Sequence, residues 1–273
     1  MIPLPALVAL AAATAGIGAL GGLGGAVFLV PLLVLLGMDP REAAPLGILS
    51  VAAGSLAAAP RQLRAGLVHH RLGVTLEIPS SAGAIIGAVV GGVIARSVLS
   101  RLLALVALAA ALASGRRKGL RNKPSAAFVE EEPGEWPGTL AGAYQLDEDV
   151  VPYHAQRVPA GLLAMAGAGF VSGIAGVGGG FIKTPTMSEI MHVPVRVAAA
   201  TTTFTVAITA AASLVVYGGQ GRIEFRHGAA VVVGGLLGGT FGSWLQTRLH
   251  PQRIRLVITG ALVVVALLLG IKG

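Results

Sequence analysis

The chain has 273 residues, of which 54% are hydrophobic and only 12% are charged, and its formal net charge is +8. Its mean hydropathy is +0.80, and the almost uncharged runs 1–40, 72–95 and 256–271 are long enough to span a bilayer, which takes about 20 apolar residues. This composition excludes a soluble globular domain and predicts an all-α polytopic membrane protein.

The apolar elements expected in the first half of the chain lie at about 4–20, 25–37, 43–60, 73–95 and 97–114. A polar connector comes next, which begins with a basic cluster and ends in a predicted hairpin at 143–153, where Pro152 would need an edge position. The elements expected in the second half lie at about 159–175, 180–191, 195–217, 227–248 and 252–271. We therefore divide the chain into a first transmembrane repeat at 1–114, a connector at 115–157 and a second transmembrane repeat at 158–273.

The positive charges lie mostly at the ends of apolar runs. Cytoplasmic loops of membrane proteins collect Lys and Arg, so we attribute the charge to topology, place the connector in the cytoplasm and expect no nucleic-acid partner. The first apolar stretch has no basic residue before Arg41, unlike a cleaved signal peptide, and we interpret it as the first membrane element. The chain has no cysteine, which excludes disulfides, a thiol nucleophile and a cysteine-based metal site.

Two glycine-rich segments occupy matching places in the two halves. A shift of about 154 residues lays Gly22 on Gly176, and each segment is succeeded by a short apolar run and a proline, Pro31 or Pro185. The second elements, about 12 residues each, are short for a span and typical of a re-entrant or glycine-broken helix. Counted as spans, they give five helices per repeat and inverted repeats; counted as re-entrant, they give four and parallel repeats. The Lys/Arg distribution does not separate the two counts.

Glycine clusters inside apolar runs indicate that the backbone itself is needed there. Each glycine weakens a helix by about 1 kcal/mol relative to alanine. A helix break presents N–H groups at the positive end of a half-helix, which suits an anion, and irregular backbone is tolerated in a membrane where it lines a cavity. Interrupted segments at corresponding places in two halves point to a transporter's binding site. The alternative is close helix packing, which we favour for Gly83, Gly87, Gly238 and Gly242.

Lys183 and two threonines are the side chains added to this candidate site. An ionisable group inside a membrane segment is costly and is a functional hypothesis by default, with snorkelling to the interface as the alternative. The hydroxyls of Thr201 and Thr202 could line a polar path or bond carbonyls of their own helix. The predicted substrate-binding set is Gly22, Gly24, Gly25, Pro31, Gly176, Gly178, Gly179, Gly180, Lys183, Pro185, Thr201 and Thr202.

Other polar residues receive structural interpretations. Glu77, near the start of a helix, is interpreted as a favourable helix-dipole contact, and His69 and His70 as loop histidines. The sequence contains no nucleophile elbow, zinc-protease or phosphate-loop motif. We therefore expect no enzymatic activity, no metal and no cofactor.

At the two glycine-and-proline segments, and at 197–205, the chain resembles the sulfite exporter TauE/SafE family of membrane permeases. The likeness covers nearly the whole chain, although Ala26 stands where the second half has Gly180 and no lysine matches Lys183. The resemblance implies a multi-pass inner (plasma) membrane protein that moves sulfite, an organosulfonate or a related sulfur-containing or carboxylate anion. We expect secondary active transport by alternating access, with protons as a hypothetical coupling ion and a homo-oligomer left open. An anion channel and a non-transporting membrane scaffold are the alternatives.

Overall fold

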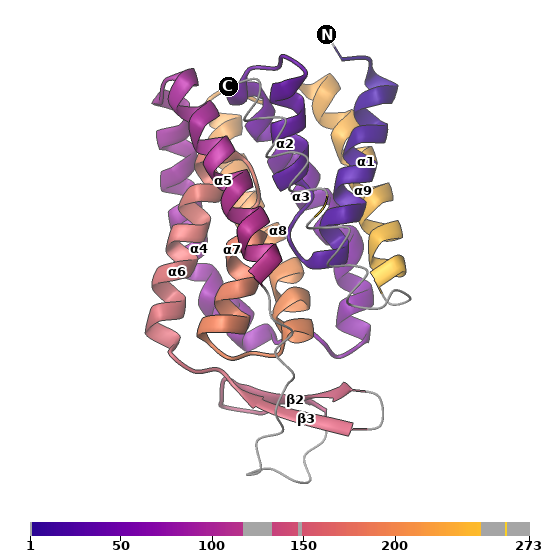
Figure 1. The fold of residues 1–273 in the computed structure, drawn as a ribbon, viewed down its shortest axis with the longest axis vertical. Helices are drawn as coiled ribbons and strands as arrows, with labels where there is room; N and C mark the ends of the chain where they lie inside the picture. The colour runs from indigo at the N-terminus through magenta and orange to yellow at the C-terminus, as the bar shows by residue number, and fades with distance from the viewer. Residues whose placement is uncertain (1, 117–132, 147–148, 247–259, 261–273) are drawn as a thin grey trace.

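The computed structural model describes residues 2–116, 133–146, 149–246 and 260, and forms a helical bundle with a small sheet beyond one end (Figure 1). The helices of the first half are α1 (Leu4–Gly21), α2 (Ala26–Leu35), α3 (Pro40–Arg64), α4 (His70–Val93) and α5 (Arg96–Arg116). Those of the second half are α6 (Val158–Ala175), α7 (Gly180–Pro185), the π-helical η1 (Thr186–Ile190), α8 (Val195–Gly219) and α9 (Phe225–Gln246). The strands are β1 (Gly134–Glu135), β2 (Ala141–Leu146) and β3 (Asp149–His154).

Six helices of the described residues are long and apolar enough to cross a membrane: α1, α3, α4, α6, α8 and α9. The predicted polytopic α-helical class is therefore confirmed. The second short element, expected as one helix over 180–191, is instead divided at Pro185 into α7 and η1. Proline has no N–H for the helical ladder, and the π-turn after it is closed by the Met191 N–H, which donates to Thr186 O at 3.1 Å. The element expected at 252–271 lies outside the described residues except for Gly260.

Helices from different halves are packed together through glycines. α1 packs along α9, and α4 packs along α6. A Cβ at Gly238 would lie 2.1 Å from Ala12 O, and a Cβ at Gly83 would lie 2.2 Å from Ala166 O, so both pairs of helices depend on glycine for their close approach. The packing interpretation of these glycines, and of Gly87 and Gly242, is confirmed.

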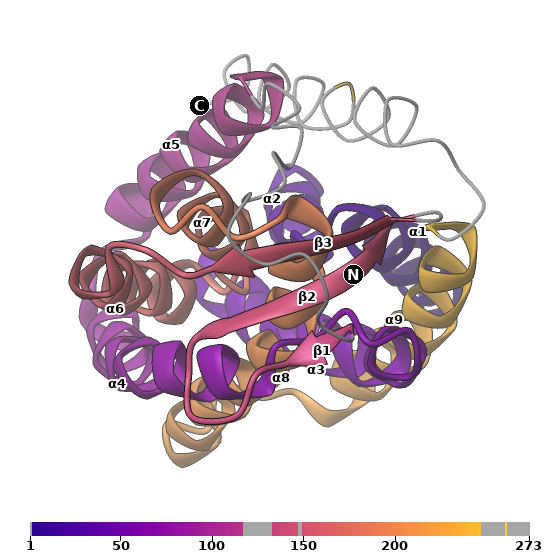
Figure 2. The ribbon, with the colours of Figure 1, turned by 90° about the horizontal axis from the view of Figure 1, so that it is seen from below.

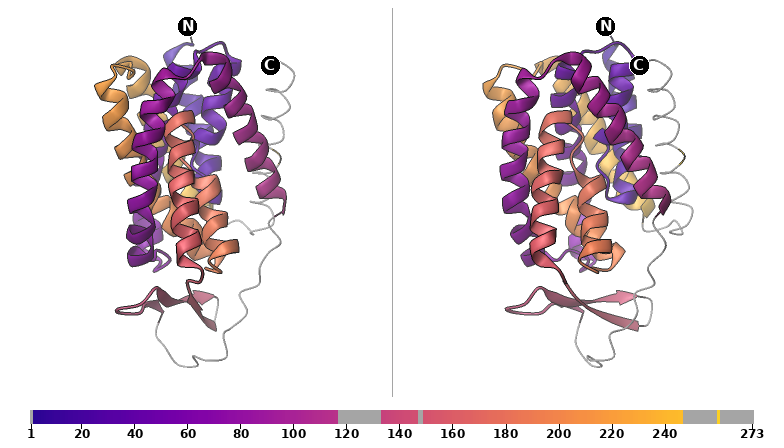
Figure 3. Two further views of the ribbon diagram at one scale, coloured as in Figure 1. Left: turned by 90° about the vertical axis from the view of Figure 1, so that its left-hand side faces the viewer. Right: turned by 60° about the vertical axis from the view of Figure 1, so that its left-hand side comes forward.

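The first helices of the two halves start at opposite ends of the bundle. α1 begins at the end far from the sheet, whereas α6 begins at the end that carries the sheet (Figures 1 and 3). Repeats with opposite starting points are inverted. The existence of the repeat stays a prediction, and so does the division of the chain at 114 and 157. The observed helix directions do not fit a parallel arrangement.

The sheet lies across one end of the bundle (Figure 2). Its order is β1-β2-β3, all antiparallel, which confirms the expected hairpin and leaves Pro152 on the edge strand β3 opposite Ala143. β1 was not expected from the sequence. Tyr144 of the sheet is buried in one apolar cluster with Met187 and Met191. The connector is therefore packed onto the helical bundle.

Candidate transport site

The two glycine-rich segments form two turns, each of which ends one helix and begins a shorter one. The first glycine turn (22–25) comes after α1, and the second glycine turn (176–180) comes after α6. Gly24 and Gly178 have φ of +75° and +82°, in the left-handed region where a residue with a Cβ is strained. The helix breaks expected from the glycine pattern are therefore present at both places.

The two glycine turns lie against each other. Thr184 Oγ1 donates to Gly22 O at 3.1 Å, and a Cβ at Gly180 would lie 2.6 Å from Leu23 O. The side chain of Val51 on α3 touches both turns, since added Cβ atoms at Gly178 and Gly24 would lie 2.7 and 3.3 Å from its Cγ2. The structure thus brings together the glycines that the sequence predicted as one site.

Some of the backbone N–H groups in both turns have no acceptor in the described structure. The ladder of α2 starts when Phe28 and Leu29 donate to Gly25 O, and that of α7 when Ile182 and Lys183 donate to Gly179 O. The N–H groups of Gly24, Gly25, Gly178 and Gly179 meet no acceptor among the described residues, whereas those of Leu23 and Gly176 donate to Gly18 O and Ser172 O. Buried N–H groups without acceptors are rare, and at the positive end of a half-helix they suit an anion.

A small cavity adjoins the first glycine turn. Its lining comes from α1, the turn, α3 and α8: Ala15, Gly18, Ala19, Gly24, Gly25, Ser50, Val51, Gly54, Ser55, Thr203 and Val206. The Ser50 hydroxyl is fully buried and has no hydrogen-bond partner in the described structure. Gly178 touches the same Val51 but does not line the cavity.

The threonines at the start of α8 have different surroundings. Thr201 Oγ1 accepts a hydrogen bond from the buried His69 N–H at 3.0 Å. Thr203 Oγ1 donates to Ala199 O of its own helix at 2.9 Å. Thr202 Oγ1 is buried, and the described residues give it no partner. Of the two predicted threonines, Thr202 therefore retains an unused hydroxyl, while Thr201 holds the loop before α4.

Lys183 is buried, with 1% of its side chain exposed, which rules out the snorkelling alternative. Its Nζ lies 2.7 Å from Glu77 Oε2 of α4 and also donates to Thr209 Oγ1 of α8. Glu77 Oε1 accepts from Thr209 and, at 3.1 Å, from Ser81. The helix-dipole interpretation of Glu77 is wrong, because its carboxylate is buried in an ion pair with Lys183. In the sequence, Glu77 and Lys183 each lie among apolar residues. Their opposite charges were the signal from which the ion pair could have been predicted.

Pro31 lies inside α2, and Pro185 is the last residue of α7. Each removes one ladder hydrogen bond from a short helix that already begins at a glycine turn. Pro185 in addition precedes the π-helical η1. We interpret both prolines as shaping the short helices, because neither offers an N–H to a ligand.

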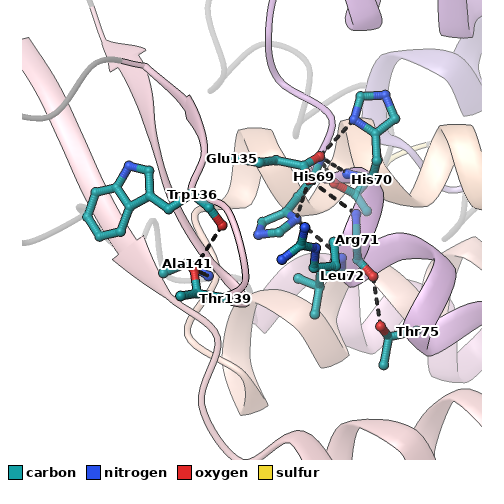
Figure 4. A network of polar contacts seen from close by, with 10 residues as sticks. His69, His70, Arg71, Leu72, Thr75, Glu135, Trp136, Thr139 and Ala141 are labelled. Carbon is teal, nitrogen blue, oxygen red and sulfur yellow. Dashed lines mark hydrogen bonds and ion pairs between the residues drawn. The ribbon is translucent and has the colours of Figure 1, made fainter.

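His69 and His70 meet the connector sheet at the start of α4 (Figure 4). Glu135 of β1 points toward the helix, contacts His70 Nδ1 at 2.7 Å and accepts from the Arg71 N–H at 3.3 Å. Burial lowers the pKa of His69. Burial alone would raise the pKa of Glu135, but the N–H groups of His70 and Arg71 and the His70 ring bring it below its ordinary value. The described residues contain no group of three potential ligands that could hold a metal. The interpretation as loop histidines is wrong, because His70 is the first residue of α4 and the buried His69 is its N-cap, whose Nδ1 accepts from the Leu72 N–H at 3.2 Å.

Comparison with known proteins identifies the family. The family described as "Sulfite exporter TauE/SafE" matches residues 7–269. The chain belongs to the sulfite exporter TauE/SafE family. This TauE/SafE protein is also similar to the "Probable membrane transporter protein YunE" of Bacillus subtilis (strain 168), with 24% identity over 120 residues. That match spans 44% of each of the two chains, and no solved structure matches. The chain is therefore a multi-pass protein of a membrane transporter family, which is not a family of enzymes.

Proposed function

We propose that this TauE/SafE protein carries a small anion across the inner (plasma) membrane, and that the anion is sulfite, an organosulfonate or a related carboxylate. One observation carries the proposal: two glycine turns, one from each half of the chain, lie against each other, and the N–H groups of Gly24, Gly25, Gly178 and Gly179 have no acceptor in the described structure. Peptide dipoles that point at one place can hold an anion in a membrane without a fixed countercharge.

In this proposal the N–H groups of Gly24, Gly25, Gly178 and Gly179 bind the oxygens of the anion. Ser50 and Thr202 add hydroxyl donors, since both are buried on the helices next to the turns and have no described partner. Pyramidal and tetrahedral oxyanions suit such a site because they present several acceptor oxygens to donors that come from several directions.

The side chain of Val51 lies between Gly24 and Gly178, and we infer that α3, which carries it, moves during transport. The Val51 side chain touches both Gly24 and Gly178, so one anion bridging the turns requires α3 to shift relative to α7. A shift between elements of the two halves is the motion that alternating access requires. Transport is then secondary active, and a proton gradient is the driving force, because the sequence has no nucleotide-binding motif.

Uptake into proteoliposomes tests this function. The purified full chain should take up labelled sulfite or methanesulfonate with saturation, and an inward proton gradient should accelerate uptake. Gly24→Ala and Gly178→Ala should reduce uptake, whereas Gly221→Ala should not. Gly221 also has a positive φ, +66°, but nothing lies within 4 Å of a Cβ there, so it controls for backbone strain alone.

Three results would contradict the proposal in different ways. Uptake that never saturates indicates a channel. Absence of uptake for sulfite, sulfonates and carboxylates alike indicates a scaffold. Uptake that is equal with the gradient collapsed removes the proton coupling and leaves the anion site in place.

A further inference from the structure

A four-residue network of buried polar side chains lies beside the second glycine turn. It joins Lys183 of α7, Glu77 and Ser80 of α4, and Thr209 of α8. Lys183 Nζ and Glu77 Oε2 are 2.7 Å apart, and the two side chains are 1% and 6% exposed. Lys183 lies one helical turn beyond the second glycine turn, since its N–H donates to Gly179 O at 3.0 Å. The network therefore connects the proposed anion site to two membrane-spanning helices.

Two further buried hydroxyl groups, of Thr202 and Ser213, lie on the same face of α8 as Thr209. Thr209 comes seven residues after Thr202, and Ser213 comes eleven residues after Thr202. These spacings place the three side chains on one stripe of the helix. Thr209 bonds both charged partners, whereas the oxygens of Thr202 and Ser213 are buried without a hydrogen bond in the described structure. A stripe of buried hydroxyls, two of them unused, suits the movement of a proton or an oxyanion toward the ion pair better than a purely structural contact does.

Among the residues that the structure describes, Lys183 is the charged partner of Glu77. Helix α6, which packs along α4, carries no ionisable side chain between 158 and 175. Of the other elements packed on α4, α8 has Arg196 at its start, and α4 itself has His70 and Arg71 at its first turn, all of them exposed. An unpaired buried charge is costly by several kcal/mol. The network is thus stable only in states whose total charge is zero.

We propose that Glu77 is the proton-binding residue that couples transport, and that Lys183 becomes the countercharge of the anion when Glu77 is protonated. The inference rests on the proposed function. The ion pair is neutral with no substrate bound. One proton converts the Glu77 carboxylate to a carboxylic acid and leaves one positive charge on Lys183. One monovalent anion restores neutrality, so one proton and one monovalent anion bind together and their joint movement carries no net charge.

Anion binding measured against pH tests this coupling. The probe is methanesulfonate, whose own charge does not change near neutral pH, and the protein is the purified full chain in detergent. In the wild type, Kd should rise with pH, by about tenfold per pH unit in the limit, because each bound anion takes up one proton. In Glu77→Gln the amide cannot ionise, Lys183 stays free, and Kd should be independent of pH. Glu42→Gln, at an exposed site in the first turn of α3, should keep the wild-type slope.

A second variant keeps the test decisive if Glu77→Gln does not fold. The double variant Glu77→Gln/Lys183→Gln replaces the ion pair with a neutral hydrogen-bonding pair of similar shape. It should bind methanesulfonate more weakly than the wild type, and with no pH dependence.

Two results overturn the coupling but leave the proposed function intact: a wild-type Kd independent of pH, or a wild-type slope retained in either variant. If the wild type binds no methanesulfonate, sulfite or carboxylate at any pH, the proposed function itself is contradicted, and the coupling with it.

Discussion

The two glycine turns have similar backbones but lead into different helices. After the first turn, α2 is a ten-residue helix with only apolar side chains, and Leu29 is fully buried in it. After the second turn, α7 is six residues long, continues as the π-helical η1, and carries Lys183 at the position that matches Leu29. In both turns the N–H groups of the glycines just before the short helix, Gly24 and Gly25 or Gly178 and Gly179, have no acceptor in the described structure.

The proposed transport of an anion requires two things, the binding of the anion and its coupling to a proton, and the two turns differ in the second. Backbone dipoles can bind an anion from either half, but they do not change charge with pH. Only the second turn is followed by a charged side chain, Lys183, and this side chain pairs with Glu77 on α4 of the first half. On this account the first turn supplies neutral binding groups alone, whereas the second turn supplies binding groups and also leads to the coupling pair, which Lys183 of the second half and Glu77 of the first half form together.

Lys183→Met should have the largest effect on stability. It leaves the Glu77 carboxylate buried without its partner, and breaking a buried ion pair costs about 3–5 kcal/mol. The matched control is Leu29→Met in the first half, which conserves volume and should cost less than about 1.5 kcal/mol. Chemical unfolding of the purified protein measures both. Equal losses in the two variants would contradict the asymmetry between the turns.

Gly178→Ala should be more destabilising than Gly24→Ala. The backbone strain is similar, at about 1–2 kcal/mol for a left-handed residue with a Cβ. The new Cβ would lie 2.7 Å from Val51 Cγ2 at Gly178 but 3.3 Å at Gly24, which adds a steric cost at the second turn. Val51→Ala in the Gly178→Ala background should recover part of the loss, as measured by thermal unfolding. A second substitution that recovers nothing would show that Val51 is not the obstacle.

Glu135→Gln should have the smallest effect, less than about 1 kcal/mol, because Glu135 lies at the partly exposed boundary between the sheet and α4. The pKa of Glu135 is lowered in the folded chain, so its contribution is present above the ordinary carboxyl pKa and is lost as pH falls through the lowered value. The protection of the β1–β3 amides from hydrogen exchange, corrected for the intrinsic exchange rate at each pH, should therefore fall in acid in the wild type. The same protection should vary less with pH in the variant. The same acid response in both would remove Glu135 as its cause.

Much of the fold could be predicted because bilayer-spanning segments are recognisable by their length and composition. The expected bounds of α1, α4, α6 and α8 are within a few residues of the observed ones. The helix breaks at Gly22 and Gly176 could be predicted from glycine's backbone freedom, which is a local property. The split after Pro185 was missed because a π-turn depends on how the chain beyond it is packed.

The candidate site was only partly predictable. The glycines came from a local pattern, whereas Glu77 and Lys183 are 106 residues apart and meet only when α4, α7 and α8 are packed together. Thr209 carried no sequence signal of its own, since it is one of five threonines in the first 15 residues of α8. Local sequence therefore indicated the backbone part of the site, and the tertiary packing determined its charged part.

The most direct test of the central claim is whether anions stabilise the protein through the glycine turns. Thermal unfolding would be measured with sulfite, methanesulfonate, sulfate and acetate for the wild type, Gly178→Ala and Gly221→Ala. The account predicts that at least one anion stabilises the wild type and Gly221→Ala, by about 2.7 kcal/mol at a hundred times its Kd. It also predicts that Gly178→Ala loses this gain. No stabilisation by any of the four anions, or an equal gain in Gly178→Ala, would contradict the account.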